Sequence, residues 1–299
     1  MRGPYDGAVR AVVLDEDGLP EIADVPEPTG AGLVVRVRAC GLCGSDVEKL
    51  GRAPAGTVLG HEVAGELENG ARVTIVHRVP CGTCQRCLAG HQSTCAEFAE
   101  LRIEPGGFSE RLVATHCVPL PDTIGELDGV WVEPLACVLR AAEQVPRGRV
   151  LVVGCGAIGQ LWVQVLRRRG DDVVAVDPRD ERLAAAHLLG ADLDDGDVDA
   201  AVVTAHAGLD DALGRLEPGG TLLVFAAPDG EVPVAIDTVY RRELRVVGSR
   251  SATPAFFRAA CDLLPTLVVP EVTTLPLDRF LEGVDLYRRG DALKVVFTP

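Results

Sequence analysis

Two segments near the start of the chain alternate apolar and polar residues in part, as strands with one buried face do. They are residues 8–14 (AVRAVVL) and 33–39 (LVVRVRA), and a connection rich in proline and glycine, residues 20–32, separates them. The pattern predicts antiparallel strands that belong to a β-rich first domain.

The middle of the chain has a different pattern. A fully apolar run passes directly into a glycine-rich turn at residues 150–159, VLVVGCGAIG. Residues 157–169 follow with the apolar spacing of a helix, and the next apolar run, VVAVD, ends in Asp177. Because buried parallel strands are apolar throughout and alternate with helices, this stretch predicts a βαβ unit.

Later apolar runs continue this alternation and predict a doubly wound parallel sheet. The later strands of that sheet are residues 198–204, 221–226 and 244–247. Thr253 and Pro254 suit the cap and first turn of a helix over 252–264. The last predicted elements are a helix over 278–289 and a strand over 293–297.

The glycines of the central turn suit a bound dinucleotide. Gly154 permits the turn, Gly156 lets a pyrophosphate approach the backbone, and Gly159 lets the helix pack against the strand. The first helical residues, Ala157 and Ile158, lie where free N–H groups and the positive end of the helix dipole face the phosphates. A βαβ unit without a nucleotide is the alternative.

Composition limits the class of protein. A chain of 299 residues predicts two domains. A net charge of −15 without any basic run argues against a nucleic-acid partner. The N-terminus has no apolar signal segment, and no apolar stretch approaches the roughly 18 residues of a membrane span. We therefore expect a soluble cytoplasmic protein without a membrane partner.

The ten cysteines concentrate in one loop. Residues 81–95 read CGTCQRCLAGHQSTC, which spaces four cysteines as C-x2-C-x2-C-x7-C. In a long cytoplasmic chain such a set predicts a closed, structural zinc site with four thiolate ligands. An iron–sulfur cluster, disulfides or a redox role are the alternatives. The predicted ligands are Cys81, Cys84, Cys87 and Cys95, whereas His91 is expected to face solvent.

A second set of metal-competent residues lies on two other segments, CGLCGSD at 40–46 and GHEVAG at 60–65. Cys43, His61 and Glu62 offer sulfur, nitrogen and oxygen, and catalytic zinc sites usually gather three protein ligands while leaving a position open. The spacing alone leaves a core cysteine, a hydrogen-bonded core histidine and a surface glutamate equally open.

Together, CGLCGSD, GHEVAG, the four-cysteine loop, GCGAIG and Asp177 resemble the zinc-dependent medium-chain dehydrogenase/reductase family over nearly the whole chain. The segment EPLACVLRA, which begins at Glu133, makes it most similar to the sorbitol and threonine dehydrogenase branch. The resemblance implies an α/β fold with a GroES-like catalytic domain (1–131), a Rossmann domain (132–251) and a C-terminal segment (252–299) that returns to the catalytic domain. It also implies a catalytic zinc held by Cys43 and His61, with Glu62 and Glu133 as competing carboxylate ligands.

Three features depart from the family pattern. The hairpin after GHE is short, running directly from Glu66 to Gly70. The Rossmann domain has too few residues between Asp177 and 198–204 and is expected to lack about one helix. Glu48 stands where a proton-relaying histidine is frequent, and a glutamate can shuttle a proton if its pKa suits.

The resemblance implies hydride transfer between the carbon of a small-molecule alcohol or ketone and NAD, with zinc as a Lewis acid. Ser45 is expected to accept the proton first, and Asp46 to orient a ligand histidine. The alternative is a non-catalytic nucleotide-binding or thiol-sensing protein on the same scaffold. The sequence does not name the substrate. Similar proteins form dimers or tetramers, so a homo-oligomer is expected.

The choice of cofactor depends on the end of the second strand of the βαβ unit. Asp177 is expected to accept hydrogen bonds from the ribose hydroxyls of NAD and to repel the 2′-phosphate of NADP. Arg179 and Arg182 follow closely, and an arginine here can bind that phosphate or, in the case of Arg182, lie over the adenine. The balance favours NAD.

Overall fold

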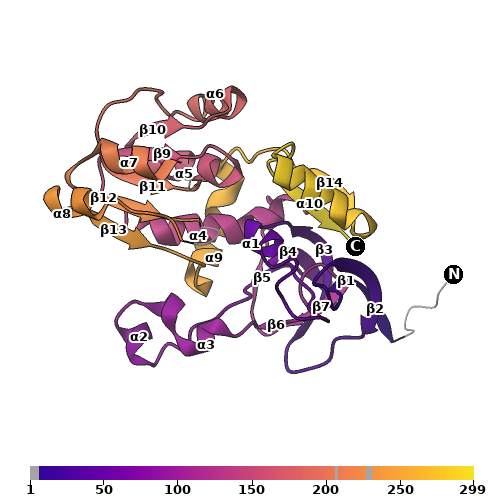
Figure 1. Ribbon diagram of the computed structural model, residues 1–299. Coiled ribbons are helices and arrows are strands. Elements are labelled where there is room, and N and C mark those ends of the chain that lie inside the picture. Colours follow the sequence, from indigo (N-terminus) through magenta and orange to yellow (C-terminus); the bar gives the residue numbers. More distant parts are fainter. Residues whose placement is uncertain (1–6, 206–207, 227–230) are drawn as a thin grey trace. The chain divides into compact units, whose positions relative to one another are not determined.

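The computed structural model describes residues 7–205, 208–226 and 231–299. The chain forms two compact units (Figure 1). Among the described residues, the first contains those of 7–136, 252–265 and 271–299, and the second those of 137–251 and 266–270. In the described part of the chain, no helix combines the length and apolar character needed to cross a membrane.

The first unit is built on an eight-stranded, mainly antiparallel sheet, with the order β14-β15-β3-β4-β5-β8 and with β7 paired to both β3 and β6. Its strands are β3 (Leu33–Gly41), β4 (Glu62–Leu67), β5 (Arg72–Ile75), β6 (Ile103–Glu104), β7 (Arg111–Ala114), β8 (Cys117–Pro119), β14 (Thr273–Pro276) and β15 (Val295–Thr298). The short hairpin predicted after GHE joins β4 and β5. The β-rich domain expected from the alternating pattern is therefore confirmed.

One local expectation is wrong. Residues 20–32 are not a simple connection, because β2 (Pro20–Pro26) lies within them and pairs along its whole length with β1 (Ala8–Leu14). These two strands form their own sheet, so β1 does not pair with β3. Prolines are tolerated at the two ends of β2 because a strand with only one neighbour keeps one edge free of ladder bonds.

The chain returns to the first unit after the parallel sheet. The returning helices are α9 (Pro254–Leu263), capped by Thr253, and α10 (Phe280–Arg289). The Phe280 ring packs against Phe108 and Phe297, with ring centroids 4.9 Å and 4.8 Å away. The core of the antiparallel sheet is thus closed by the last residues of the chain, as the predicted final helix and strand require.

The last strand also brings a lysine into this core. The sequence has two lysines, Lys49 and Lys294, and Lys294 is only 4% exposed. Its ammonium group forms an ion pair with Glu62, which is 2% exposed, and lies 5.4 Å from the centroid of the Trp131 ring. Burial lowers the pKa of Lys294, but the charges of Glu62 and Cys43 outweigh burial and raise it, so the lysine stays charged.

The second unit is a five-stranded parallel sheet of order β10-β9-β11-β12-β13. Its strands are β9 (Arg149–Val153), β10 (Asp172–Val176), β11 (Val198–Val203), β12 (Leu216–Val224) and β13 (Arg245–Gly248). Its helices are α5 (Ala157–Arg169), α6 (Asp180–Leu188), α7 (Leu209–Arg215) and α8 (Ile236–Arg241), while α4 (Val132–Ala142) leads into it. The predicted doubly wound sheet is confirmed, and the helix predicted over 157–169 has the observed bounds.

This sheet has one strand fewer than the usual six of a Rossmann sheet, whose order is 3-2-1-4-5-6. The strand order here matches that pattern without its strand 3. Where that strand would lie, Asp192 makes one isolated parallel bridge with Val174, and a short loop then leads to β11. The short linking sequence therefore removes an edge strand and leaves the paired centre of the sheet intact.

The buried ion pair predicts a large stability effect. Lys294→Met leaves the Glu62 carboxylate buried without its cation, which costs about 3–5 kcal/mol in the free energy of unfolding. Urea unfolding of the first unit measures this loss, and Lys49→Met, at an exposed lysine, is the matched control. A loss below about 1 kcal/mol in Lys294→Met would contradict the prediction.

Candidate functional site

Three residues with metal-binding side chains converge in the first unit. One ligand atom from each of Cys43, His61 and Glu62 lies within 4.8 Å of the others. Ligand atoms around a tetrahedral zinc lie roughly 3.3–3.8 Å apart, given bonds of about 2.0–2.3 Å. The set therefore fits a zinc ion after small side-chain movements, and three protein ligands leave a fourth position open.

Asp46 fixes two of these residues in place. It lies in α1 (Gly44–Val47), is 1% exposed, and accepts a hydrogen bond from the Cys43 N–H at 3.1 Å. Its other oxygen lies 3.3 Å from His61 Nδ1, which leaves Nε2 to face Cys43. Burial raises the pKa of Asp46, but the charge and hydrogen bond of His61 outweigh it and lower the pKa. Asp46 thus stays ionised and sets the orientation of the histidine ring.

The two carboxylates expected to compete for the metal have different positions. Glu62 belongs to the converging group and is paired with Lys294, whereas Glu133, 6% exposed in α4, lies outside the group. The negative charge of Glu133 is one cause of the raised Lys294 pKa. Both glutamates therefore act on the same buried ammonium group.

The two residues expected to move protons lie beside the converging group. The Ser45 hydroxyl donates a hydrogen bond to Cys43 Sγ at 3.4 Å. Glu48 is half-buried at the end of α1, and its charge acts on the nearby phenol of Tyr287. Both residues therefore follow the candidate ligand Cys43 on or at the end of the same short helix.

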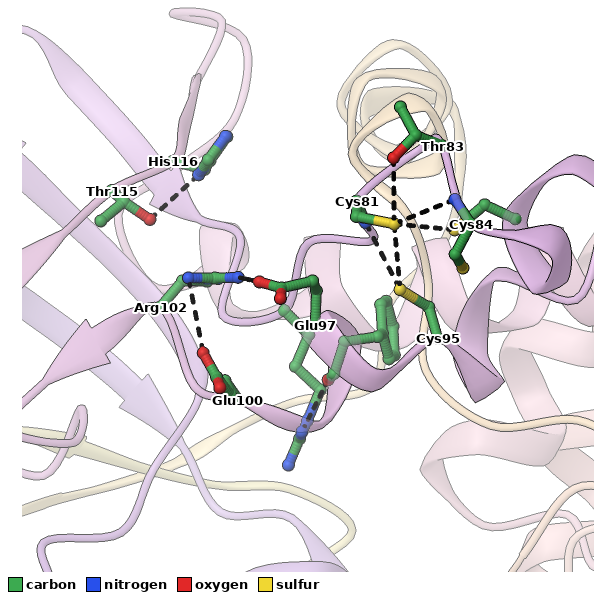
Figure 2. A network of polar contacts seen from close by, with 12 residues as sticks. Cys81, Thr83, Cys84, Cys95, Glu97, Glu100, Arg102, Thr115 and His116 are labelled. Atoms are coloured by element: carbon green, nitrogen blue, oxygen red, sulfur yellow. Dashed lines mark hydrogen bonds and ion pairs between the residues drawn. The ribbon is translucent and has the colours of Figure 1, made fainter.

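The four-cysteine loop forms a second cluster of possible ligands, whose sulfur atoms all lie within 4.8 Å of one another. Figure 2 shows Cys81 at its centre, 3.6 Å from the sulfur of Cys95 and accepting a hydrogen bond from the Cys84 N–H at 3.3 Å. Backbone hydrogen bonds lower the pKa of Cys81 to about 6, whereas burial raises that of Cys87 to about 12. These sulfur separations suit a four-thiolate metal site and are too long for disulfides.

The loop has almost no apolar core of its own. Its short helices, α2 (Gln85–Leu88) and α3 (Ala96–Ala99), surround a buried cluster made of Cys87, Cys95 and Phe98. The expected solvent exposure of His91 is confirmed. So small a cluster stabilises the loop little by itself.

The glycine-rich turn joins β9 to α5 in the second unit. Gly154 has φ +90°, a conformation that L side chains rarely adopt. A Cβ on Gly159 would collide with the Gly154 carbonyl oxygen, so the start of α5 packs directly on the turn. Gly156 caps α5, and Ala157 and Ile158 begin it, with their N–H groups at the helix N-terminus.

Asp177 follows β10 and faces this turn. One carboxylate oxygen accepts a hydrogen bond from the Cys155 N–H at 2.7 Å, and the other accepts one from the Arg179 N–H at 2.9 Å. Arg182 Nη1 lies 3.9 Å from the position of a Cβ built on Gly156. Asp177 and Arg182 therefore both lie beside the glycine-rich turn, as the sequence pattern indicated.

Sequence reasoning missed three polar residues near the converging ligands. They are Lys294, Tyr287 and His77, whose ring centroid lies 4.9 Å from that of His61. His77 is 5% exposed, and its Nδ1 has no hydrogen-bond partner among the described residues. A lysine in an apolar strand of a lysine-poor chain was the one available signal, because contacts made by the returning C-terminal segment are not encoded in local spacing.

We compared the chain with known protein families and with characterised proteins. A family model described as Alcohol dehydrogenase GroES-like domain matches residues 30–122, and one described as Ketopantoate reductase PanE/ApbA matches residues 150–222. The D-altritol 5-dehydrogenase of Agrobacterium fabrum is 32% identical over 81% of this chain and 84% of its own. The sorbitol dehydrogenase of Halalkalibacterium halodurans is 29% identical over 97% of this chain and 99% of its own.

Solved structures agree with the sequence relatives. A protein of Sinorhizobium meliloti, described as a zinc-binding dehydrogenase and bound to NADP, has a TM-score of 0.83 and 27% identity, covering 98% of this chain and 99% of its own. The resemblance expected from the motifs is thus confirmed. The chain belongs to the zinc-dependent medium-chain dehydrogenase/reductase family, a family of alcohol and polyol oxidoreductases.

Proposed function

We propose that this protein transfers a hydride between the carbinol carbon of a polyol or other secondary alcohol and NAD, with the help of a bound zinc. The observation that carries the proposal is the convergence of Cys43, His61 and Glu62 within 4.8 Å, in a chain that also has a dinucleotide-type turn. The polyol relatives support the substrate class. Turnover with NAD over a panel of polyols and secondary alcohols tests it.

Cys43, His61 and Glu62 would hold the catalytic zinc, and Cys81, Cys84, Cys87 and Cys95 a structural zinc. We favour Glu62 over Glu133 because only Glu62 lies among the converging ligand atoms. A zinc held there supplies Lewis acidity that makes an alcohol easier to deprotonate. Asp46 keeps His61 oriented, Ser45 receives the substrate proton, and Glu48 passes it towards solvent.

The nicotinamide cofactor would bind at the turn of the second unit. Gly154, Gly156 and Gly159 provide the close approach for the pyrophosphate, and the N-terminus of α5 provides its N–H groups. Asp177 would accept hydrogen bonds from the ribose hydroxyls, and its charge favours NAD over NADP. Arg182, beside Gly156, would lie along the adenosine end of the cofactor.

We also propose that the protein is cytoplasmic and forms a homodimer. None of the ten cysteines, all of which lie in the described residues, forms a disulfide, and this suits the reducing cytoplasm. β13 forms one edge of the parallel sheet, and Val246 in it is an exposed apolar residue. Pairing of two β13 edges would give a homodimer and cover this residue.

Loss of one cysteine of the four-cysteine loop is expected to destabilise the protein. Cys84→Ser removes a thiolate, so zinc content falls by about one equivalent and the melting temperature falls with it. Cys117→Ser, at a half-buried cysteine outside both clusters, is the control. If Cys84→Ser keeps its full zinc content and melting temperature, the four-cysteine loop does not hold a structural zinc.

Loss of a catalytic ligand is expected to separate activity from cofactor binding. Cys43→Ala or His61→Ala lowers kcat/KM by about a thousandfold, because several kcal/mol of Lewis-acid stabilisation are lost. NAD affinity, measured by fluorescence titration, stays within about twofold because the turn lies in the other unit. A parallel loss of NAD affinity would indicate misfolding instead.

Replacement of Asp177 tests the cofactor preference. Asp177→Ala is expected to reduce the ratio of kcat/KM for NAD to that for NADP by about tenfold or more, mainly because repulsion of the 2′-phosphate is removed. Asp180→Ala, at an acid in the first turn of α6, is the control. A wild-type protein with the higher kcat/KM for NADP would show that the role given to Asp177 is wrong.

A further inference from the structure

Tyr287 brings a phenol from the end of the chain to the converging ligands. It lies in α10, whose buried residues Phe280 and Val284 anchor the helix in the core of the first unit. The Tyr287 ring packs against the same core and is half-buried. The anchored helix and the packing of the ring together hold the hydroxyl in place.

The hydroxyl lies directly over the residue that follows Cys43. A Cβ built on Gly44 would lie 2.8 Å from the Tyr287 hydroxyl oxygen, so any side chain at position 44 would displace it. Gly44 stands between the candidate ligand Cys43 and the candidate proton acceptor Ser45. The phenol is thus held beside the residue that links Cys43 to Ser45.

The hydroxyl is available as a hydrogen-bond donor. Burial, followed by the charges of Cys43, Glu62 and Glu48, raises the pKa of Tyr287 to about 12, so the phenol keeps its proton at neutral pH. It has no hydrogen-bond partner within residues 7–205, 208–226 and 231–299, and the tyrosine is only half-buried. An O–H group without a partner beside the candidate ligands can bind a small polar molecule there.

We infer that Tyr287 is a specificity residue, whose hydroxyl donates a hydrogen bond to a substrate hydroxyl on the carbon next to the reacting one. This inference rests on the proposed function, because it assumes an alcohol bound beside Cys43. A polyol has that neighbouring hydroxyl and a simple secondary alcohol does not. The phenol therefore favours polyols over simple alcohols of similar size.

The test compares sorbitol with 2-butanol, using the zinc-loaded protein and NAD. Tyr287→Phe keeps the packed ring and removes only the donor. We expect KM for sorbitol to rise about tenfold with kcat nearly unchanged, and KM for 2-butanol to stay within twofold. Tyr240→Phe, at an exposed tyrosine of α8, is the matched control and is expected to change neither KM.

The outcomes separate the two proposals. If the wild-type protein oxidises no member of the panel of polyols and secondary alcohols, the proposed function fails and the inference about Tyr287 fails with it. If both alcohols are oxidised and Tyr287→Phe changes their kcat/KM values equally, or changes neither, only the inference is overturned. An unchanged melting temperature in Tyr287→Phe confirms that the comparison concerns binding and not folding.

Discussion

The buried ion pair between Glu62 and Lys294 is the constraint on which the first unit depends. Removing two charges from water is costly, and each charge is tolerated only because the other is in contact with it. Glu62 begins β4 and Lys294 directly precedes β15, so the pair ties residues 232 positions apart. Gly41 is needed between them because a side chain there would collide with both. The C-terminal segment therefore holds Glu62 in its position among the converging residues.

The two metal clusters differ in what they require from the rest of the protein. The converging group is supported by a large core and by Asp46, which is held by backbone N–H groups of Cys43 and Gly60. The buried cluster of the four-cysteine loop contains one large side chain, that of Phe98. Ion pairs of Arg102 with Glu97 and Glu100 add contacts beside the loop (Figure 2). The converging residues are thus held in place by the surrounding protein, whereas few apolar contacts hold the cysteines of the loop.

The second unit shows how a parallel sheet tolerates a deletion. Loss of an edge strand removes one set of ladder bonds, whereas β9, which carries the glycine-rich turn, keeps β10 and β11 as neighbours. The carboxyl ends of these central strands carry Gly154, Asp177 and Thr204, the last of which donates a hydrogen bond to the Gly154 carbonyl. The trimmed chain therefore preserves the part of the sheet where ligands bind in this class of fold.

The sequence by itself determined the elements whose signals are local. The apolar run into GCGAIG, the helix over 157–169, Asp177 after its strand and the spacing of the four cysteines all follow from short-range periodicity and ligand spacing. The sequence pattern did not predict β2, because the prolines at the ends of this strand are more typical of a connection. It also could not bring Cys43, His61 and Glu62 together, or place Lys294 and Tyr287 beside them. Cys43 meets the other two ligands through the pairing of β3 with β4. The C-terminal residues reach them through the pairing of β15 with β3 across more than 200 residues, and only the tertiary structure decides these pairings.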